Sequence, residues 1–153
     1  MNDVALRPAT MDDVEFFFAL HKASFGPYVD EVWGWDDGDQ RAYLTRNLVV
    51  EQVRVIVVDG VDVGRLDVEE RDDELFLGLI ELQPDYQSRG IGGRVIRDLL
   101  AQARADGKRV ALSVLDVNQR AYALYRRLGF EEVSRNGVAP EMRIRMVAQL
   151  EPE

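Results

Sequence analysis

Glycines and a basic side chain gather in one short segment of the chain, Gln87-Ser88-Arg89-Gly90-Ile91-Gly92-Gly93. A strand-like apolar run precedes this segment, and a helix-like run follows it. The first N–H groups of a helix have no partners within the helix and lie at the positive end of its dipole. Glycines leave those groups uncovered, so a pyrophosphate can approach several donors at once, and Arg89 adds a charge-assisted contact. The segment predicts a phosphate-binding turn, with a turn that merely tightens packing as the alternative.

Two other phosphate-binding motifs do not fit this sequence. A dinucleotide-binding Gly-x-Gly-x-x-Gly would need glycine where Val95 stands. A P-loop would need its first glycine where Gln102 stands. The local charge still suits an anion, because six basic residues stand against two acidic ones between Gln87 and Arg109. Because both motifs fail, a nucleotide-binding protein is the weaker hypothesis.

The elements that position this turn follow from hydrophobic periodicity and turn residues. A helix from about Thr10 to Phe25 should end at Gly26-Pro27, and one or two short helices should follow within 28–47. Asp59-Gly60 predicts a hairpin turn. The remaining expected helices are Ile91–Ala105 and Asn118–Leu128, and the expected strands are Val4–Leu6, Val53–Val58, Val61–Leu66, Leu75–Leu82, Val110–Leu115, Phe130–Ser134 and Met142–Val147.

Length and composition limit the fold to one soluble α/β domain. The chain has 153 residues, of which 46% are apolar, so we expect a single domain over 1–153 with a real core. The strand–helix–strand–helix order from Leu75 to Leu128 implies parallel pairing inside a mixed sheet, with a central strand covered on both faces. We expect a twisted sheet of about 6–7 strands, both antiparallel and parallel, with about four flanking helices.

Charge and cysteine content argue against several classes of protein. The net charge of −9 is the opposite of what a nucleic-acid binder needs. The absence of cysteine excludes disulfides and thiol catalysis, and the single histidine, His21, cannot build a metal cluster alone, so no metal is expected. We expect an ordinary packing or surface role for His21. No apolar run is long enough to span a bilayer and no signal peptide is evident, so a cytoplasmic protein is expected.

Two blocks of sequence resemble the GNAT superfamily of N-acetyltransferases. The first is Gln87-x-x-Gly90-x-Gly92, preceded by Ile80-Glu81-Leu82-Gln83-Pro84, which looks like the acyl-CoA signature of that family. The second block follows after a helix and a strand, in the family's order, and consists of Asn118, Ala121, Leu124-Tyr125 and Leu128-Gly129-Phe130. The resemblance is specific between Leu75 and Phe130. It implies a GNAT-like fold and acetyl-CoA as co-substrate.

The resemblance also implies roles for individual residues. Backbone groups of Ile80 and Leu82 would pair with the pantetheine arm, and Asn118 would hydrogen-bond it. Tyr125 would lie near the sulfur as general acid to the leaving thiolate. Asn118 could instead be a plain helix cap, and Tyr125 a half-buried aromatic. The pyrophosphate would be held by backbone N–H groups of Gln87, Ser88, Arg89, Gly90, Ile91, Gly92 and Gly93.

Direct acetyl transfer also needs a base, because a protonated amine cannot attack a thioester. Glu81 interrupts an apolar strand next to the expected thioester, so it is the first candidate for this base, acting directly or through water. A solvated carboxylate at the end of a strand is the competing interpretation.

A second cluster of side chains suits the acceptor. Aromatic faces with nearby carboxylates attract ammonium groups, and in the resembling family this segment commonly walls the acceptor side. A short helix that packs its tryptophans on the core is the alternative. The residues expected to bind the acceptor are Tyr28, Trp33, Trp35 and Asp36.

The sequence thus favours an enzyme that transfers acetyl from acetyl-CoA to a primary amine by direct attack in a ternary complex. The acceptor would be a small molecule or a peptide end that carries a positive amine. The alternative is a non-catalytic acyl-CoA-binding or regulatory module on the same fold. Dimers are common in the family, so a homodimer is one expected assembly. Nucleic acids and membranes are not expected partners.

Overall fold

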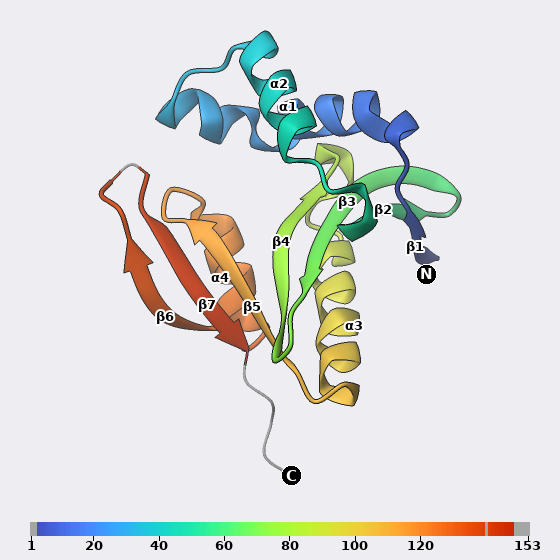
Figure 1. The fold of residues 1–153 in the computed structure, drawn as a ribbon, viewed down its shortest axis with the longest axis vertical. Helices are drawn as coiled ribbons and strands as arrows, with labels where there is room; N and C mark the ends of the chain where they lie inside the picture. The colour runs from blue at the N-terminus through green and yellow to red at the C-terminus, as the bar shows by residue number, and fades with distance from the viewer. Residues whose placement is uncertain (1–2, 140, 149–153) are drawn as a thin grey trace. The chain divides into compact units, whose positions relative to one another are not determined.

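The computed structural model describes residues 3–139 and 141–148. The strands are β1 (Val4–Pro8), β2 (Val53–Val58), β3 (Val61–Glu70), β4 (Glu74–Leu82), β5 (Arg109–Leu115), β6 (Glu131–Asn136) and β7 (Arg143–Ala148). The α-helices are α1 (Val14–Val32), α2 (Asp37–Asn47), α3 (Ile91–Ala105) and α4 (Gln119–Arg127), with short 3-10 turns at Met11–Asp13, Val50–Gln52 and Pro84–Tyr86. The seven strands form one mixed sheet in the order β1-β2-β3-β4-β5-β7-β6 (Figure 1). The expected α/β class and the central position of β4 are confirmed.

The chain folds as two compact units. Within the described residues, the first unit comprises the residues up to Asp67 together with Leu79–Arg89. The second comprises Val68–Gly78 and the residues from Gly90 onward. Strands β3 and β4 each contribute residues to both units.

Antiparallel strands and helices α1 and α2 build the first unit. Strand β1 pairs with β2, and β2 pairs with β3 across Asp59-Gly60. Both turn residues adopt positive φ, 51° at Asp59 and 83° at Gly60, which suits a two-residue hairpin turn. The predicted hairpin is confirmed. A core cluster forms where α1 and α2 meet these strands, and its buried members are Phe17, Leu44, Val53 and Val55.

Helix α1 continues seven residues beyond its predicted end at Phe25, so that prediction was wrong. Pro27 cannot donate to the carbonyl of Ala23, but both residues are exposed, so water can reach that carbonyl. Beyond the proline, Val29 is buried and keeps the helix packed on the unit. Packing therefore outweighs the local breaker signal, and the following Trp33–Asp36 forms a non-helical link to α2.

A βαβ arrangement organises the second unit. Strand β4 pairs in parallel with β5 over Glu74–Leu77, and β5 and β6 both pair antiparallel to β7. Helix α3 has the predicted bounds, and its apolar stripe, including Val95, Ile96 and Leu99, is buried. The predicted closing pair of strands is confirmed.

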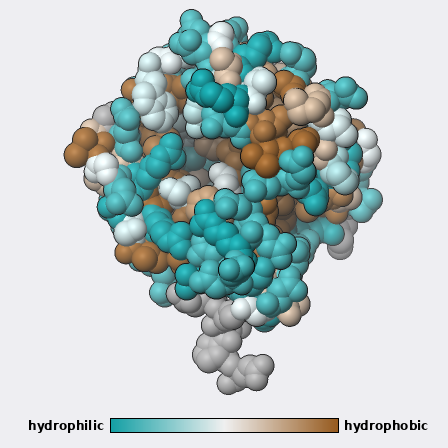
Figure 2. Space-filling view, viewed as in Figure 1, coloured by the Kyte–Doolittle hydropathy of each residue, from teal (hydrophilic) through white to brown (hydrophobic). Residues whose placement is uncertain are grey.

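Figure 2 shows hydrophilic residues over most of one face, with hydrophobic residues in smaller patches. In the part of the chain that the structure describes, no helix combines the length and hydropathy needed to cross a bilayer.

Candidate functional site

The C-terminal half of β4 has an edge that β5 does not occupy. Pairing with β5 runs from Glu74 to Leu77, and among the described residues it does not continue along Leu79–Leu82. On its other side, the backbone of β4 lies very close to that of β3. A Cβ added at Gly64 of β3 would lie only 2.4 Å from the carbonyl oxygen of Glu81. Gln83 N–H also donates to the carbonyl of Val63 at 2.8 Å. The open edge of Leu79–Leu82 can accept an extended ligand by strand addition.

The turn after β4 is held to the strand by side-chain contacts. The Gln87 side-chain amide donates to the carbonyl of Leu82 at 3.0 Å. The Arg89 guanidinium lies 5.0 Å above the ring of Tyr86. Ser88 has a φ of 62°, which is unusual for a residue with a side chain and costs backbone strain.

Helix α3 begins immediately after this turn. Gly90 is its N-cap, with a left-handed φ of 81° that favours glycine. The N–H of Arg94 makes the first helical bond, to the Gly90 carbonyl at 3.0 Å. The N–H groups of Ile91, Gly92 and Gly93 therefore precede the helical ladder and lie at the positive end of the helix dipole. This is the arrangement that the sequence predicted for an anion.

Two residues of the second predicted block lie at opposite ends of α4. Asn118 is buried and caps the helix, because its Oδ1 accepts from the N–H of Ala121 at 3.3 Å. Tyr125 is buried with its ring 5.8 Å from that of Phe130. Burial raises the pKa of Tyr125 to about 12, so its phenol keeps a proton at neutral pH. Such a group can donate a proton but cannot serve as a base.

Glu81 lies in a buried polar cluster, not at a solvated strand end. Its side chain has no exposed surface. His21 Nδ1 lies 2.8 Å from Oε2, and Ser24 Oγ lies 2.7 Å from the same oxygen. The other oxygen, Oε1, is buried without a hydrogen-bond partner among the described residues. An unpaired buried carboxylate oxygen is costly, and such groups concentrate at functional sites.

Charged residues of β3 adjoin this cluster. Arg65 is buried and donates to both oxygens of Asp67, at 2.6 and 2.8 Å. Burial raises the pKa of Asp67, the Arg65 guanidinium lowers it, and the charge of Glu81 adds a smaller upward contribution.

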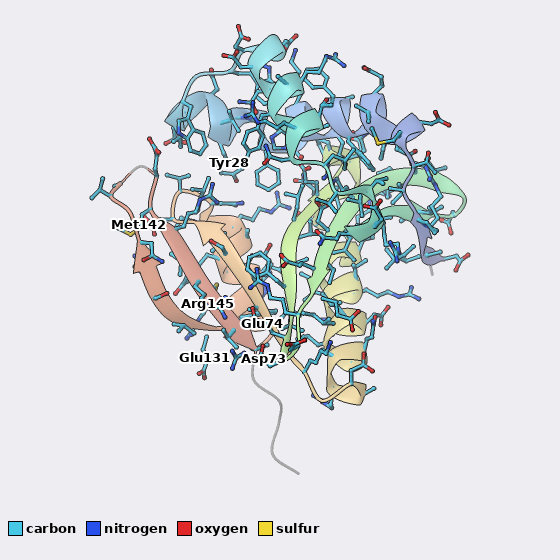
Figure 3. All side chains as sticks on the ribbon, viewed as in Figure 1. Tyr28, Asp73, Glu74, Glu131, Met142 and Arg145 are labelled. Atoms are coloured by element: carbon cyan, nitrogen blue, oxygen red, sulfur yellow. The ribbon has the colours of Figure 1, made fainter. Side chains whose placement is uncertain are left out.

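Aromatic rings surround the imidazole of His21. The ring of Phe25 stacks on it at 5.6 Å between centroids, and the ring of Trp35 lies 5.9 Å away. Tyr28, labelled in Figure 3, lies next to Phe25 at 6.1 Å. Trp35 is held in place, because its indole N–H donates to Asp37 at 2.6 Å and its backbone N–H donates to Asp30 at 3.0 Å.

The predicted acceptor residues therefore separate into two groups. Trp35 and Tyr28 belong to the aromatic surroundings of His21, whereas Trp33 is 49% exposed at the end of α1. Asp36 caps α2 by accepting from the N–H of Asp39 at 2.9 Å. The structure leaves the acceptor assignments of all four residues as predictions.

Sequence reasoning missed His21 and Ser24 as neighbours of Glu81. A signal was present, because His21, Ser24, Phe25 and Tyr28 have the i, i+3, i+4, i+7 spacing of one helix face. A glutamate inside an apolar strand also requires a polar partner. Which helix supplies that partner is a long-range property that periodicity does not reveal.

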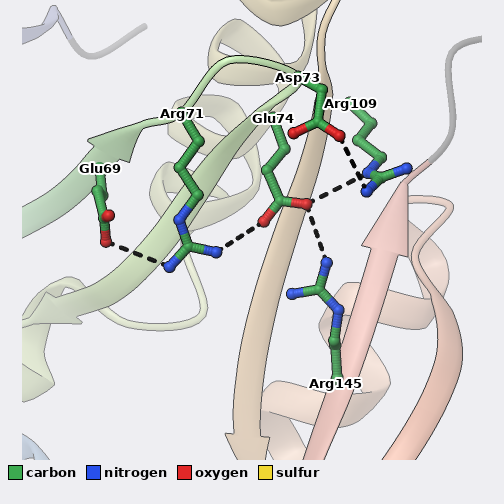
Figure 4. Close-up of polar contacts among 6 residues, drawn as sticks. All are labelled: Glu69, Arg71, Asp73, Glu74, Arg109 and Arg145. Atoms are coloured by element: carbon green, nitrogen blue, oxygen red, sulfur yellow. Dashed lines mark hydrogen bonds and ion pairs between the residues drawn. The ribbon is translucent and has the colours of Figure 1, made fainter.

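A second buried carboxylate, Glu74, begins strand β4 in the second unit. Its oxygens accept from Arg71 at 2.9 Å, Arg109 at 3.2 Å and Arg145 at 2.9 Å (Figure 4). Burial alone would raise the pKa of Glu74, but the guanidinium groups together lower it. This carboxylate has partners on both oxygens.

The model of the Acetyltransferase (GNAT) family matches residues 14–130. This chain belongs to the GNAT acetyltransferase family. The match covers most of the chain, including both blocks of the sequence resemblance.

Individual relatives agree with this membership. The chain is 50% identical over 54 residues to the N-alpha-acetyltransferase RimI of Mycobacterium tuberculosis, which is 35% of this chain and 33% of that protein. The match thus spans about a third of that relative's length.

Two solved structures share the fold. One is the ribosomal-protein-S18-alanine N-acetyltransferase of Escherichia coli, with a TM-score of 0.71, 19% identity, and coverage of 100% of this chain and 96% of that one. The other is the PaiA N-acetyltransferase of Thermoplasma acidophilum in complex with coenzyme A, with a TM-score of 0.72, 12% identity, and coverage of 94% and 98%.

Proposed function

We propose that this GNAT-family protein transfers an acetyl group from acetyl-CoA to a primary amine by direct attack in a ternary complex. The observation that carries the proposal is the Gln87–Gly93 turn, which follows an unoccupied edge of β4 and opens α3. Family membership supports acetyl-CoA as the donor, and the solved relative from Thermoplasma acidophilum was crystallised with coenzyme A.

The proposed cofactor site uses backbone groups for most of its contacts. The pyrophosphate accepts from the N–H groups that open α3, those of Ile91, Gly92 and Gly93, and Arg89 adds positive charge. The N–H of Gln87, which the sequence also suggested for this role, already donates to the carbonyl of Pro84 at 3.2 Å. The pantetheine pairs with the backbone of Ile80 and Leu82, as an added strand would. Asn118 hydrogen-bonds the pantetheine, and Tyr125 protonates the leaving thiolate, a role that its raised pKa supports because the phenol stays protonated at neutral pH.

The proposed acceptor is a small molecule or peptide end with a cationic amine. Trp35 and Tyr28 offer aromatic faces, and Asp36 contributes negative charge, with Trp33 at the exposed border. Each cation–π contact contributes about 0.5–2 kcal/mol. RimI is named as an N-alpha-acetyltransferase and the Escherichia coli relative as an N-acetyltransferase of alanine in ribosomal protein S18, which is compatible with this class of acceptor.

Calorimetric titration with acetyl-CoA tests the cofactor site. Gly92→Val puts a branched side chain at the second residue of α3, where the phosphates approach, and we expect acetyl-CoA binding to be lost in a folded protein. Gly38→Val is a matched control, because Gly38 is the second residue of α2. The same substitution there changes the helix propensity by the same amount but lies outside the proposed phosphate site. Equal affinity of the Gly92 variant and the wild type would contradict the assigned site.

Thiol release separates an enzyme from a binding module. Wild-type protein with acetyl-CoA and a panel of polyamines, amino acids, arylamines and short peptides should release coenzyme A only when an acceptor amine is present. Tight acetyl-CoA binding with no acceptor-dependent release would favour the non-catalytic module.

A further inference from the structure

We infer that His21 is the general base of the acetyl transfer, and that Glu81 is the positioning residue that holds its imidazole and stabilises its protonated form. This inference rests on the proposed function and assigns the one role in it that the family pattern leaves open. It is carried by the His21–Glu81 hydrogen bond and by the difference in exposure between the two side chains.

The exposure of the two groups decides which of them meets the amine. The Glu81 side chain has no exposed surface, whereas 20% of the His21 side chain is exposed. A base must touch the ammonium group and later return its proton to water. His21 can do both, but Glu81 can do so only through His21 or through a molecule that enters the buried site.

In the proposed role, the imidazole donates the hydrogen bond and the Glu81 carboxylate accepts it. An ionised carboxylate only accepts, so the proton between His21 and Glu81 lies on Nδ1. The neutral ring then presents a lone pair at Nε2, for which the described residues provide no hydrogen-bond donor. Ser24 cannot replace His21 as the constant donor to Glu81, because its one hydroxyl proton is shared between Glu81 and the carbonyl of Leu20, 2.8 Å away.

Charged and aromatic side chains lie around the His21–Glu81 pair. Glu81 contacts the imidazole directly, and Asp67, which interacts electrostatically with Glu81, is paired with Arg65. Beyond Trp35, Asp37 pairs with Lys22 at 3.0 Å. Phe25 and Trp35 limit rotation of the imidazole, so the ring loses little rotational freedom when the transition state forms.

Position along β4 brings this base to the proposed thioester. Glu81 lies between Ile80 and Leu82, whose backbones are proposed to pair with the pantetheine. In a strand the side chain of Glu81 points to the opposite face from its two neighbours, and helix α1 with His21 covers that face. An amine that reaches Nε2 therefore approaches the strand segment that would carry the acetyl group.

The proton and bond changes balance as follows. An alkylammonium and acetyl-CoA give the N-acetyl amine, coenzyme A thiol and one proton. Nε2 of His21 takes one proton from the nitrogen, whose lone pair forms the new C–N bond. The C–S bond breaks with its electron pair on sulfur, and the thiolate takes a proton from Tyr125. The second proton lost by nitrogen replaces the one that Tyr125 gave, and the proton on His21 passes to water.

A spectroscopic test follows from the composition, because His21 is the only histidine of the chain. In untagged protein labelled with ¹⁵N-histidine, a two-dimensional ¹H–¹⁵N spectrum reports the tautomer of this one ring without assignment. We expect Nδ1 to be the protonated nitrogen of the neutral ring in the wild type, and the proportion of the Nε2–H form to rise in Glu81→Gln. A wild-type ring protonated at Nε2 would overturn the inference, since that nitrogen could not then accept.

Kinetics test the catalytic role itself. With saturating acetyl-CoA, we expect His21→Ala to lower kcat about 10²–10³-fold while the affinity for acetyl-CoA stays within twofold. The limb of the wild-type pH profile that reports the base should disappear, and added imidazole should restore part of the rate. Unchanged kcat in a folded His21→Ala protein, or an unchanged pH profile, would refute the role of His21. A wild type that releases no thiol with any amine would instead refute the proposed function, and the base assignment with it.

Discussion

The two buried carboxylates of strand β4 have opposite surroundings. Glu74 accepts from three arginines, whereas Glu81 has one histidine, one shared hydroxyl and an oxygen with no partner among the described residues. A buried charge with complete ionic partners is stable and unreactive, but one with an unsatisfied oxygen is held at a cost in free energy. From this difference we propose that Glu81 serves the chemistry of the first unit, and we expect Glu74 to stabilise the second unit.

The largest effect on stability is expected at Glu74. Glu74→Gln removes the charge that three guanidinium groups share, and we expect a loss of about 2–3 kcal/mol in the free energy of unfolding. This is less than the ~3–5 kcal/mol of a fully buried pair, because the arginine side chains are 31–40% exposed. Denaturant unfolding at neutral pH measures it, and a loss below 0.5 kcal/mol would contradict a structural role.

The pH dependence of stability sharpens the same contrast. The arginines lower the pKa of Glu74 below its ordinary value of 4.5, so its contribution is present above that value and is lost as pH falls through the lower, folded-state pKa. Unfolding of the wild type followed between pH 6 and pH 2 should therefore show a steeper acid loss than Glu74→Gln. Parallel curves for the two proteins would show that Glu74 is not linked to stability in this way.

The next prediction concerns kcat and the hydroxyl group of Tyr125. Tyr125→Phe removes only the hydroxyl, and we expect kcat to fall at least about tenfold with acetyl-CoA affinity within twofold. Because folding raises the pKa of Tyr125 from 10.0 to about 12, the wild type should also lose stability as pH rises from 10 towards 12, a loss that the variant lacks. An equal kcat, with chemistry shown to be rate-limiting, would remove Tyr125 from the mechanism.

The smallest effect is expected from the tryptophans. Trp35 contacts the His21 ring, whereas Trp33 is half exposed at the end of α1. We expect Trp35→Ala to raise KM for a cationic amine about fivefold and Trp33→Ala by less, in line with one cation–π contact. Equal effects of the two changes, or a larger effect at Trp33, would move the acceptor site away from Trp35.

The sequence predicted the fold well where the signals were local. The bounds of α3 and the Asp59-Gly60 hairpin depend on neighbouring residues, and the structure has both elements in place. The glycine-rich turn also precedes α3 as expected, and its binding of phosphate stays a prediction. The predicted end of α1 at Phe25 was wrong, because burial of Val29 outweighs the tendency of Gly26-Pro27 to end a helix.

The candidate site was predictable only in part. Glu81 stood out because a charge interrupts an apolar strand, but its burial and its partners on α1 depend on how the helix packs on the sheet. The spacing of His21 and Ser24 was visible in the sequence, yet spacing does not say what a helix face contacts. Long-range packing decides that, and no motif of the chain encodes it.

One paired measurement tests the contrast between the carboxylates most directly. Glu81→Gln and Glu74→Gln make the same chemical change on the same strand, and kcat per folded molecule is measured for both with acetyl-CoA and one acceptor amine. We predict that Glu81→Gln lowers kcat about 10²-fold, because a carboxylate that orients a base histidine can contribute up to about 10⁴-fold, whereas Glu74→Gln keeps kcat within twofold. Equal losses in both variants, or wild-type kcat in Glu81→Gln, would contradict the account.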